Sequence, residues 1–158
     1  MAKPATDGTK TIATNRRARF DYAIEDTYEA GLVLRGSEVK SLRAGRAHLS
    51  DAYAMMRDGE AFLVGSYIAP YEFARDGGHD PTRTRKLLLH KREIERLAVA
   101  VAERGQTVVP MRLYFRDGRA KVELGVGKGK TRFDKRETIK RRQADREMER
   151  AIRHRSLD

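Results

Sequence analysis

The chain is 158 residues long, has a formal net charge of +11 with 36% charged residues, and contains no cysteine. This length suits one domain with an extension, and the absence of cysteine excludes disulfides, thiolate zinc sites and a cysteine nucleophile. No apolar run is long enough to span a membrane and no secretory signal is present, so we expect a cytoplasmic protein. The large positive charge indicates an anionic partner, of which nucleic acid is the first candidate and a membrane surface the second.

The first residues predict little order. Residues 1–14 are polar and rich in Gly, Thr and Lys, so we expect a disordered leader. Asn15 can cap a short turn that carries three candidate RNA-binding side chains, Arg16, Arg17 and Arg19.

A strand and a short helix follow. Between Phe20 and Leu34 apolar residues recur at alternate positions, which is the period of a half-buried strand, and Glu29 lies on its outer face. Ser37 can cap a short helix that Gly45 ends.

Two Asp-Gly pairs predict β-hairpins, because this dipeptide between strand-like runs favours a tight turn. The first pair, Asp58-Gly59, joins residues 52–57 to residues 60–68. We therefore expect these two segments to form neighbouring antiparallel strands.

The second pair, Asp117-Gly118, joins residues 109–116 to residues 119–126, and both segments alternate strictly between apolar and polar side chains. This alternation places Lys121 on the outer face of the hairpin. The same face receives Arg112, Tyr114, Arg116 and Arg119.

Residues 70–84 hold two prolines and a Gly-Gly pair, so we expect a long mobile loop, and residues 85–89 predict another strand. One clear helix comes next and ends at Gly105. Its apolar stripe consists of Ile94, Leu97, Ala98, Val101 and Ala102.

Together these elements predict a mainly β fold. Six strands, about three helices and no repeated βαβ unit favour a small antiparallel barrel of the oligonucleotide-binding (OB) type over residues 15–126. Residues 127–158 then form a basic tail, with twelve Lys and Arg against six Asp and Glu.

The tail has few apolar anchors, so we expect it to fray when free and to become helical on a partner. Three glycines at alternate positions, Gly125, Gly127 and Gly129, predict a flexible neck, and Asp134 can cap the helix with Glu137 three residues later. A polyanion is the natural partner, and a solvated helix without a ligand is the alternative.

No pattern in the sequence supports a catalytic site or a metal site. Gly129-Lys130-Thr131 resembles part of a phosphate-binding loop, but Leu124 stands where that motif needs its first glycine. The four histidines lack metal-ligand spacing, and nothing places a nucleophile beside a base. We therefore expect a protein without catalytic residues, metal or cofactor.

Three outward residues each have two interpretations. Leu88 shares a strand face with Lys86, and it either packs on an unstacked base or is covered as core. Glu29 either accepts a hydrogen bond from a base amine or forms a surface salt bridge. Lys121 is either a phosphate contact or an ordinary exposed lysine.

Four stretches in one order resemble the small protein B, or SsrA-binding protein, family. They are Glu29-Ala30-Gly31, Gly36 to Gly45, Asp80 to Leu89, and Asp134-Lys135-Arg136. The resemblance covers about Asn15 to Arg142. It implies an OB-like barrel that binds the tRNA-like domain of transfer-messenger RNA (tmRNA) and carries it to ribosomes stalled on messages without a stop codon, the process of trans-translation.

The resemblance also implies a site. The family's RNA contacts match Glu29, Leu88 and Lys121, and the nearby basic residues complete the predicted RNA-binding set: Arg16, Arg17, Arg19, Lys86, Lys128 and Lys130. In the tail, the residues expected in the ribosomal decoding centre and the empty message channel are Phe133, Asp134, Lys135 and Arg136.

Elongation factor Tu and the small ribosomal subunit are further implied partners, and we expect a monomer. The family often has Tyr or His where this chain has Phe133, so any role there must be stacking. A structural ribosomal protein and an RNA-processing enzyme that uses exposed carboxylates remain the rival interpretations.

Overall fold

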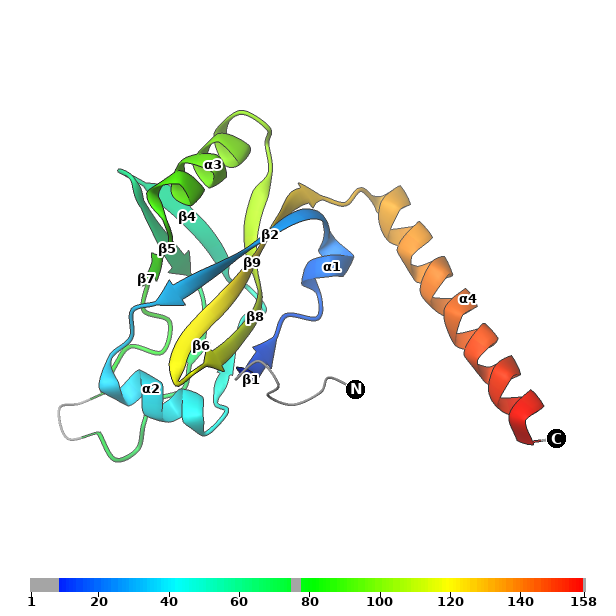
Figure 1. Cartoon of the computed structure of the whole chain (residues 1–158), viewed down its shortest axis with the longest axis horizontal. Helices are drawn as coiled ribbons and strands as arrows, with labels where there is room; N and C mark the ends of the chain where they lie inside the picture. The colour runs from blue at the N-terminus through cyan, green and yellow to red at the C-terminus, as the bar shows by residue number, and fades with distance from the viewer. Residues whose placement is uncertain (1–8, 75–77, 158) are drawn as a thin grey trace.

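The computed structural model describes residues 9–74 and 78–157, which form a strongly curved antiparallel sheet with a long helix projecting from it (Figure 1). The strands are β1 (Thr9–Thr14), β2 (Tyr22–Leu32), β3 (Ala47–His48), β4 (Tyr53–Arg57), β5 (Glu60–Val64), β6 (Tyr67–Ile68), β7 (Arg85–Leu88), β8 (Thr107–Arg116) and β9 (Arg119–Gly129). The helices are α1 (Ala18–Asp21), α2 (Gly36–Arg43), α3 (Lys91–Ala102) and α4 (Arg132–Leu157).

The fold is mainly β, as predicted, but the sheet is larger than six strands and does not close. Seven strands pair in the order β1-β8-β9-β2-β7-β5-β4, and β3 pairs separately with β6. The sheet curls until β4 approaches β8, yet no ladder joins those two strands among the described residues. The predicted barrel is therefore an open one.

Strand β1 contradicts the predicted disorder of residues 1–14, whose first part, residues 1–8, lies outside the described residues. Thr9 pairs with Arg116 and Thr14 with Arg112, so the segment covers the edge of β8. Threonine favours strands, and an uncovered edge would leave backbone groups without sheet partners. The pairing lies too far apart in sequence for a local pattern to reveal it.

Both Asp-Gly hairpins form as predicted. Asp58 and Gly59 have φ of 52° and 76°, and Asp117 and Gly118 have 51° and 78°, the left-handed pair that a tight two-residue turn requires. The predicted strand over residues 60–68 divides at Gly65, whose φ is +80°, and its second part becomes β6.

The glycines expected to form a flexible neck instead lie inside β9. A Cβ on Gly127 would stand 2.0 Å from the carbonyl oxygen of Ala23, so only glycine lets β2 approach this closely. The pairing shifts between Ile24 and Asp26, which marks a bulge beside Gly127. The sheet therefore continues to Gly129, beyond the predicted boundary at residue 126.

Helix α2 begins one residue before the predicted cap. Its N-cap is Arg35 rather than Ser37, and the backbone N–H of Arg35 donates to Glu38 Oε1 at 2.8 Å. Helix α3 buries Leu97 of the predicted apolar stripe, together with Ala100, which the stripe did not include. Val101 and Ala102 of the predicted stripe are exposed.

The described parts of the predicted mobile loop, residues 70–74 and 78–84, include a well-anchored second half. The fully buried Glu38 accepts hydrogen bonds from Arg83 and from the fully buried Arg85, both at 2.5 Å. Burial tends to raise the pKa of Glu38, but the hydrogen bonds from Arg83, Arg35 and Arg85 hold that pKa below its usual value. This buried ionic cluster ties α2 to β7.

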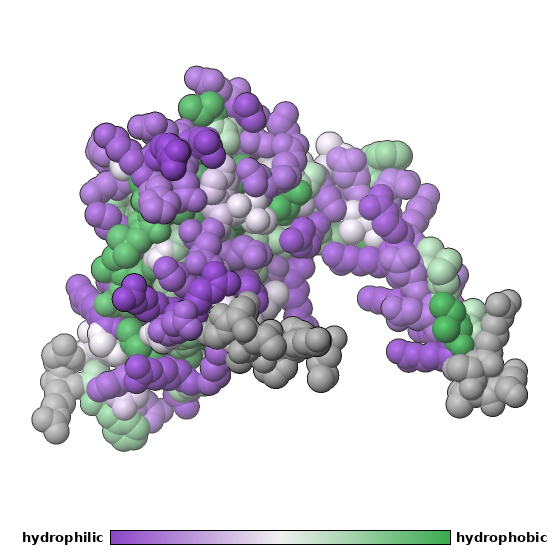
Figure 2. All heavy atoms as spheres, in the orientation of Figure 1, coloured by the Kyte–Doolittle hydropathy of each residue, from purple (hydrophilic) through white to green (hydrophobic). Residues whose placement is uncertain are grey.

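Helix α4 is 26 residues long and stands apart from the sheet, with hydrophilic side chains over most of its visible surface (Figure 2). Thr131 precedes it and exchanges hydrogen bonds with Asp134, so the cap lies three residues before the predicted one. The expectation that this segment frays when free and becomes helical on a partner stays a prediction.

Candidate nucleic-acid interface

One row of residues crosses five neighbouring strands on the outer face of the sheet. Leu88 of β7 pairs with Gly31 of β2, Gly31 with Lys121 of β9, Lys121 with Tyr114 of β8, and Tyr114 with Thr11 of β1. Directly paired residues point to the same side of a sheet. Leu88 and Lys121, predicted from separate strands, therefore share one surface.

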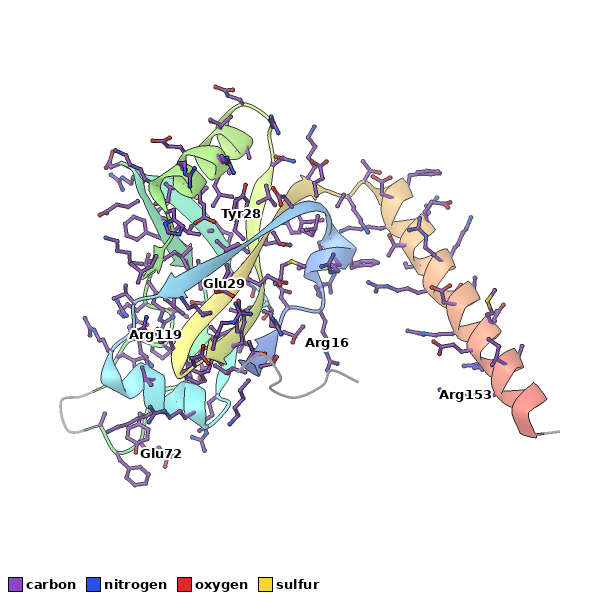
Figure 3. The ribbon with its side chains drawn as sticks, viewed as in Figure 1. Arg16, Tyr28, Glu29, Glu72, Arg119 and Arg153 are labelled. Carbon is purple, nitrogen blue, oxygen red and sulfur yellow. The ribbon has the colours of Figure 1, made fainter. Side chains whose placement is uncertain are left out.

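Glu29 joins that surface from the next row along β2. It lies two residues before Gly31 and pairs with Glu123, which in turn pairs with Arg112. Figure 3 shows Glu29 on β2, with Arg119 at the start of β9. We call this surface, carrying Glu29, Gly31, Leu88, Tyr114 and Lys121, the outer face.

Leu88 is 53% exposed, whereas its neighbour Leu87 is buried. The interpretation of Leu88 as a core residue covered by the long helix is therefore wrong. A Cβ on Gly31 would stand 3.2 Å from Leu88 Cβ, so the missing side chain at Gly31 leaves room for Leu88 to lie against β2. Lys86, on the same side of β7, forms an ion pair of 3.1 Å with Glu60.

Glu29 organises an aromatic and cationic cluster that the sequence did not reveal. Its Oε2 accepts a hydrogen bond of 2.5 Å from the hydroxyl of Tyr114 and another from Arg116. Since β9 lies between β2 and β8, Tyr114 must reach across it. Arg112 and Arg116 lie over the ring of Tyr114, 4.3 and 5.6 Å from its centroid.

Tyr114 lies on the outer face as the alternation predicts, yet only 2% of it is exposed. Burial raises the pKa of Tyr114, and the hydrogen bond to the Glu29 carboxylate raises it further. The signal that could have identified the cluster is the Arg-x-Tyr-x-Arg spacing of β8, which puts both arginines beside the same ring.

A second basic group lies near α1 and the end of β9. Arg16 and Arg19 are exposed, and Arg17 forms an ion pair of 3.6 Å with Asp21. Lys128 is exposed on β9, and Lys130 donates to Thr138 at 2.8 Å. The predicted RNA-binding residues therefore divide between two places.

Asn15, expected to cap the turn before α1, instead donates from its side chain to the carbonyl of Pro110 at 3.0 Å. The cap position belongs to Arg17, without a side-chain hydrogen bond. Asn15 thus holds α1 against β8.

The four predicted tail residues differ in their surroundings. Phe133 is 68% exposed and Arg136 is exposed, so both side chains can reach a partner. Asp134 is used in the helix cap, and Lys135 forms an ion pair of 3.2 Å with Asp21 of α1.

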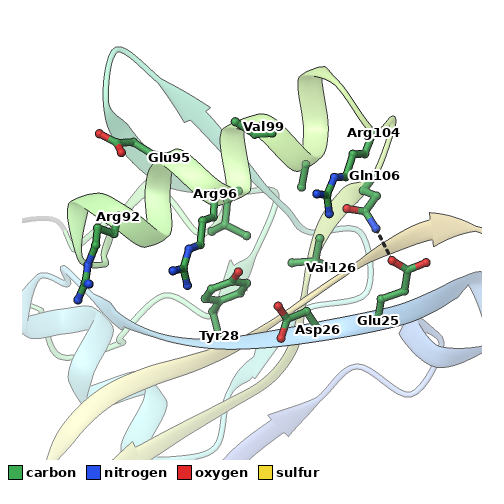
Figure 4. A pocket seen from close by; sticks show the side chains of 12 residues that line it. Glu25, Asp26, Tyr28, Arg92, Glu95, Arg96, Val99, Arg104, Gln106 and Val126 are labelled. Atoms are coloured by element: carbon green, nitrogen blue, oxygen red, sulfur yellow. Dashed lines mark hydrogen bonds between the residues drawn. The ribbon is translucent and has the colours of Figure 1, made fainter.

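A groove of about 650 Å³ opens between α3 and β2 (Figure 4). Arg92, Arg96 and Arg104 face the β2 residues Glu25, Asp26 and Tyr28 there. Burial raises the pKa of Tyr28, followed by the charge and hydrogen bond of Asp26. The groove has nearly balanced charge, and β-strand alternation separates it from the outer face.

Two further findings concern the described part of the chain. It holds no group of three His, Cys, Asp or Glu residues placed to bind a metal ion. None of its helices has the length and apolarity that a membrane span requires.

The curved antiparallel sheet carries an exposed leucine, a lysine and two arginines that lie over a buried tyrosine on one face, beside a basic helical extension. These features are typical of one class of protein, the OB-like binders of single-stranded or folded nucleic acid. The comparisons with known proteins agree. The family model described as SmpB protein matches residues 12–154. The chain belongs to the SmpB family, as the sequence motifs had suggested.

Curated relatives are close. The SsrA-binding protein of Geobacillus thermodenitrificans is 57% identical over 92% of this chain and 94% of its own length. That of Geobacter metallireducens is 54% identical over 94% and 97%.

A solved structure described as "tmRNA-SmpB: a journey to the center of the bacterial ribosome" is also similar. It is 50% identical, with a TM-score of 0.64 over 80% of this chain and 92% of the solved one.

Proposed function

We propose that this chain is the tmRNA-binding adaptor of trans-translation. Its curated relatives carry the name SsrA-binding protein, and the solved relative is described with tmRNA and the bacterial ribosome. The adaptor binds the tRNA-like domain of tmRNA and brings it to the ribosomal A site when translation has stalled.

The observation that carries the proposal is the register that brings Leu88, Gly31 and Lys121 into one row beside Glu29. Leu88 offers an apolar contact to a base or sugar, and Lys121 offers a cation to a phosphate. The half-buried position of Lys121 favours the phosphate contact, because the strands on either side restrict its side chain.

In this proposal the tail binds the ribosome. Phe133, Asp134, Lys135 and Arg136 belong to the part that enters the decoding centre of the small subunit, and α4 occupies the vacant message channel. The exposed Phe133 stacks there, and Arg136 contacts ribosomal phosphate. An occupied channel excludes the helix, which is how a stalled ribosome is distinguished from a working one.

The remaining parts of the proposal concern partners and setting. The protein acts without catalysis or cofactor, as a monomer in the cytoplasm, and elongation factor Tu accompanies the tmRNA complex to the ribosome. The Arg16, Arg17 and Arg19 group, with Lys128 and Lys130, adds phosphate contacts near the base of the tail.

A gel-shift titration with the isolated tRNA-like domain of tmRNA tests the proposal. We expect the complex to form, and the logarithm of its affinity to fall linearly with the logarithm of the salt concentration. The affinity should also be higher than that for an unrelated RNA duplex of equal length. Equal affinity for both RNAs would overturn it. Retention on ribosomes from cells without tmRNA would favour a structural ribosomal protein, and turnover of the labelled RNA would favour a processing enzyme.

A further inference from the structure

Two arginines of β8 lie on the outer face beside the predicted RNA contacts. Arg112, Tyr114 and Arg116 occupy alternate positions of β8, where the pairing with β9 is regular, so their side chains point to the same side of the sheet. Both arginines are half-buried. They add two cations to the surface that carries Lys121.

The ring of Tyr114 is a platform for these two cations and is not itself a surface for a base. The guanidinium carbons of Arg112 and Arg116 lie 4.3 and 5.6 Å from the ring centroid, within the range of a cation–π contact. Only 2% of Tyr114 is exposed, so a nucleobase has no ring face to stack on. A partner that approaches this part of the outer face therefore meets guanidinium groups.

Hydrogen bonds fix each arginine at a second point. Arg116 donates to Glu29 Oε2, the same oxygen that accepts a hydrogen bond of 2.5 Å from the hydroxyl of Tyr114. Arg112 donates from Nη1 to Thr11 Oγ1 of β1 at 3.3 Å. A guanidinium group carries five N–H donors, so these bonds orient the arginines and leave them able to bind an anion.

The charges around the platform favour an anion. Three charged residues of β9 pair with this segment of β8: Arg119, Lys121 and Glu123. Together with Glu29 and the two arginines of β8, they give four cations against two carboxylates, and one of those carboxylates is bonded to Tyr114 and Arg116. On a surface that binds RNA, the anion that suits this excess of positive charge is a backbone phosphate.

From this arrangement we propose that Arg112 and Arg116 form a phosphate-binding site for RNA, and that Tyr114 is the positioning residue that holds both. The inference deepens the proposed function, because it rests on RNA binding to the outer face and extends that surface to β8 and β1. The ring orders both guanidinium groups before RNA arrives, so less side-chain freedom is lost on binding. Glu29 keeps its own place among the RNA contacts and also orients Arg116.

The salt dependence of RNA binding tests the phosphate site. In gel-shift titrations with the isolated tRNA-like domain of tmRNA, the slope of log affinity against log salt reports how many phosphates the protein neutralises. We expect Arg112→Ala and Arg116→Ala each to reduce the magnitude of this slope by about 0.7 to 0.9, the value for one phosphate. An unchanged slope in either variant would overturn the two-arginine site.

Arg92 provides the matched control. It is an exposed arginine of α3 in the groove of balanced charge, so Arg92→Ala removes the same charge from another surface. Its slope should equal that of the parent. A reduction as large as that of Arg112→Ala would mean that only the total charge of the protein matters, which also contradicts the inference.

Two variants of Tyr114 separate the ring from its hydroxyl. Tyr114→Leu removes the platform and keeps every charge, so the affinity should fall about fivefold or more while the slope stays near that of the parent, because each released arginine must be immobilised on binding. Tyr114→Phe keeps the ring and loses only the bond to Glu29, so its loss should be clearly smaller. Equal losses in the two variants would refute the platform.

A measurement on the pure protein keeps the inference distinct from the proposed function, and it does not need Tyr114→Leu to fold. In proton NMR spectra, the Tyr114 ring current should shift the side-chain protons of Arg112 and Arg116 away from their values in a disordered chain, in the parent and in Tyr114→Phe alike. Unshifted arginine protons in the parent would refute the positioning role. Shifted protons in a parent that fails to bind the tRNA-like domain would refute the proposed function instead.

Discussion

The outer face and the tail bind their partners, in our proposal, with surfaces built in opposite ways. Leu88, Lys121 and Glu29 are placed by strand pairing, so each position is fixed by the residues paired with it. Helix α4 is placed by a two-residue connection and a few contacts with α1. A preformed sheet suits a folded RNA of constant shape, while a helix joined to the sheet through two residues has few contacts that fix its direction.

The largest effect should come from the cluster that keeps the sheet rigid. Replacing Glu38 with alanine leaves Arg85 buried and without its carboxylate, which should cost about 3 to 5 kcal/mol in the free energy of unfolding. Urea unfolding measures this, and Glu95→Ala on the exposed side of α3 is the control. A loss no larger than the control would mean that the cluster does not hold the sheet.

The same carboxylate predicts how stability depends on pH. The pKa of Glu38 in the folded protein lies below its ordinary value of 4.5, so its contribution is complete above that value and is lost as pH falls through the folded-state pKa. We expect a smaller fall in unfolding free energy between about pH 5 and pH 3 for Glu38→Gln than for the parent. Parallel curves would contradict this.

Truncation of Leu88 tests the sheet without touching the tail. Leu88→Ala should weaken binding to the tRNA-like domain by about 1 to 3 kcal/mol, because it removes an apolar contact to an unstacked base or sugar. Stability should change little, since the side chain is 53% exposed. Val101→Ala, at an exposed position of α3, should leave RNA affinity unchanged in the same gel shift.

Glu29 should act jointly with Arg116, since both belong to one cluster with Tyr114. We expect the effects of Glu29→Gln and Arg116→Ala on RNA affinity to be non-additive, with a coupling of about 0.5 to 3 kcal/mol in a double-mutant cycle. Strict additivity would instead support a direct hydrogen bond from a base amine to Glu29. Pairing Glu29→Gln with Arg104→Ala, on another surface, supplies an additive reference.

The smallest effect on stability should follow removal of the tail. Ending the chain after Thr131 removes the ion pair between Lys135 and Asp21. The two side chains are each about one third exposed, so the pair contributes at most about 1 kcal/mol to the free energy of unfolding. Binding of the tRNA-like domain should be nearly intact, and tagging should be lost. A large loss of stability would show that the sheet and the tail are one unit.

Local patterns predicted the parts of this fold that local physics determines. The two Asp-Gly turns, the presence of α3 and the alternation around Leu88 depend on residues close in sequence, and all three were correct. The predicted apolar stripe of α3 was correct only in part, because Val101 and Ala102 are exposed. The family motifs indicated which of the outward-facing residues to select as candidate RNA contacts. The strand register of the structure then showed that two of them, Leu88 and Lys121, lie in one row. Their roles in RNA binding stay predictions.

The errors share a different origin. Strand β1 depends on the distant β8, and Glu38 depends on Arg83 and Arg85 beyond a loop, so neither has a local signature. Gly127 was predicted to belong to a flexible neck. In the structure, a glycine is needed there because the carbonyl of Ala23 on another strand lies too close for a side chain. Tyr114 was placed on the correct face, but its burial required knowledge of where Glu29 would lie.

The projecting helix also bears on what happens to the protein outside its complexes. Helix α4 is rich in exposed arginine and lysine, the residues after which trypsin-like proteases cut. Digestion should therefore shorten the chain from this end first and leave the sheet intact. Such a fragment would keep the outer face without the tail, so even partial cleavage would create an inhibitor that occupies tmRNA and blocks the uncut molecules.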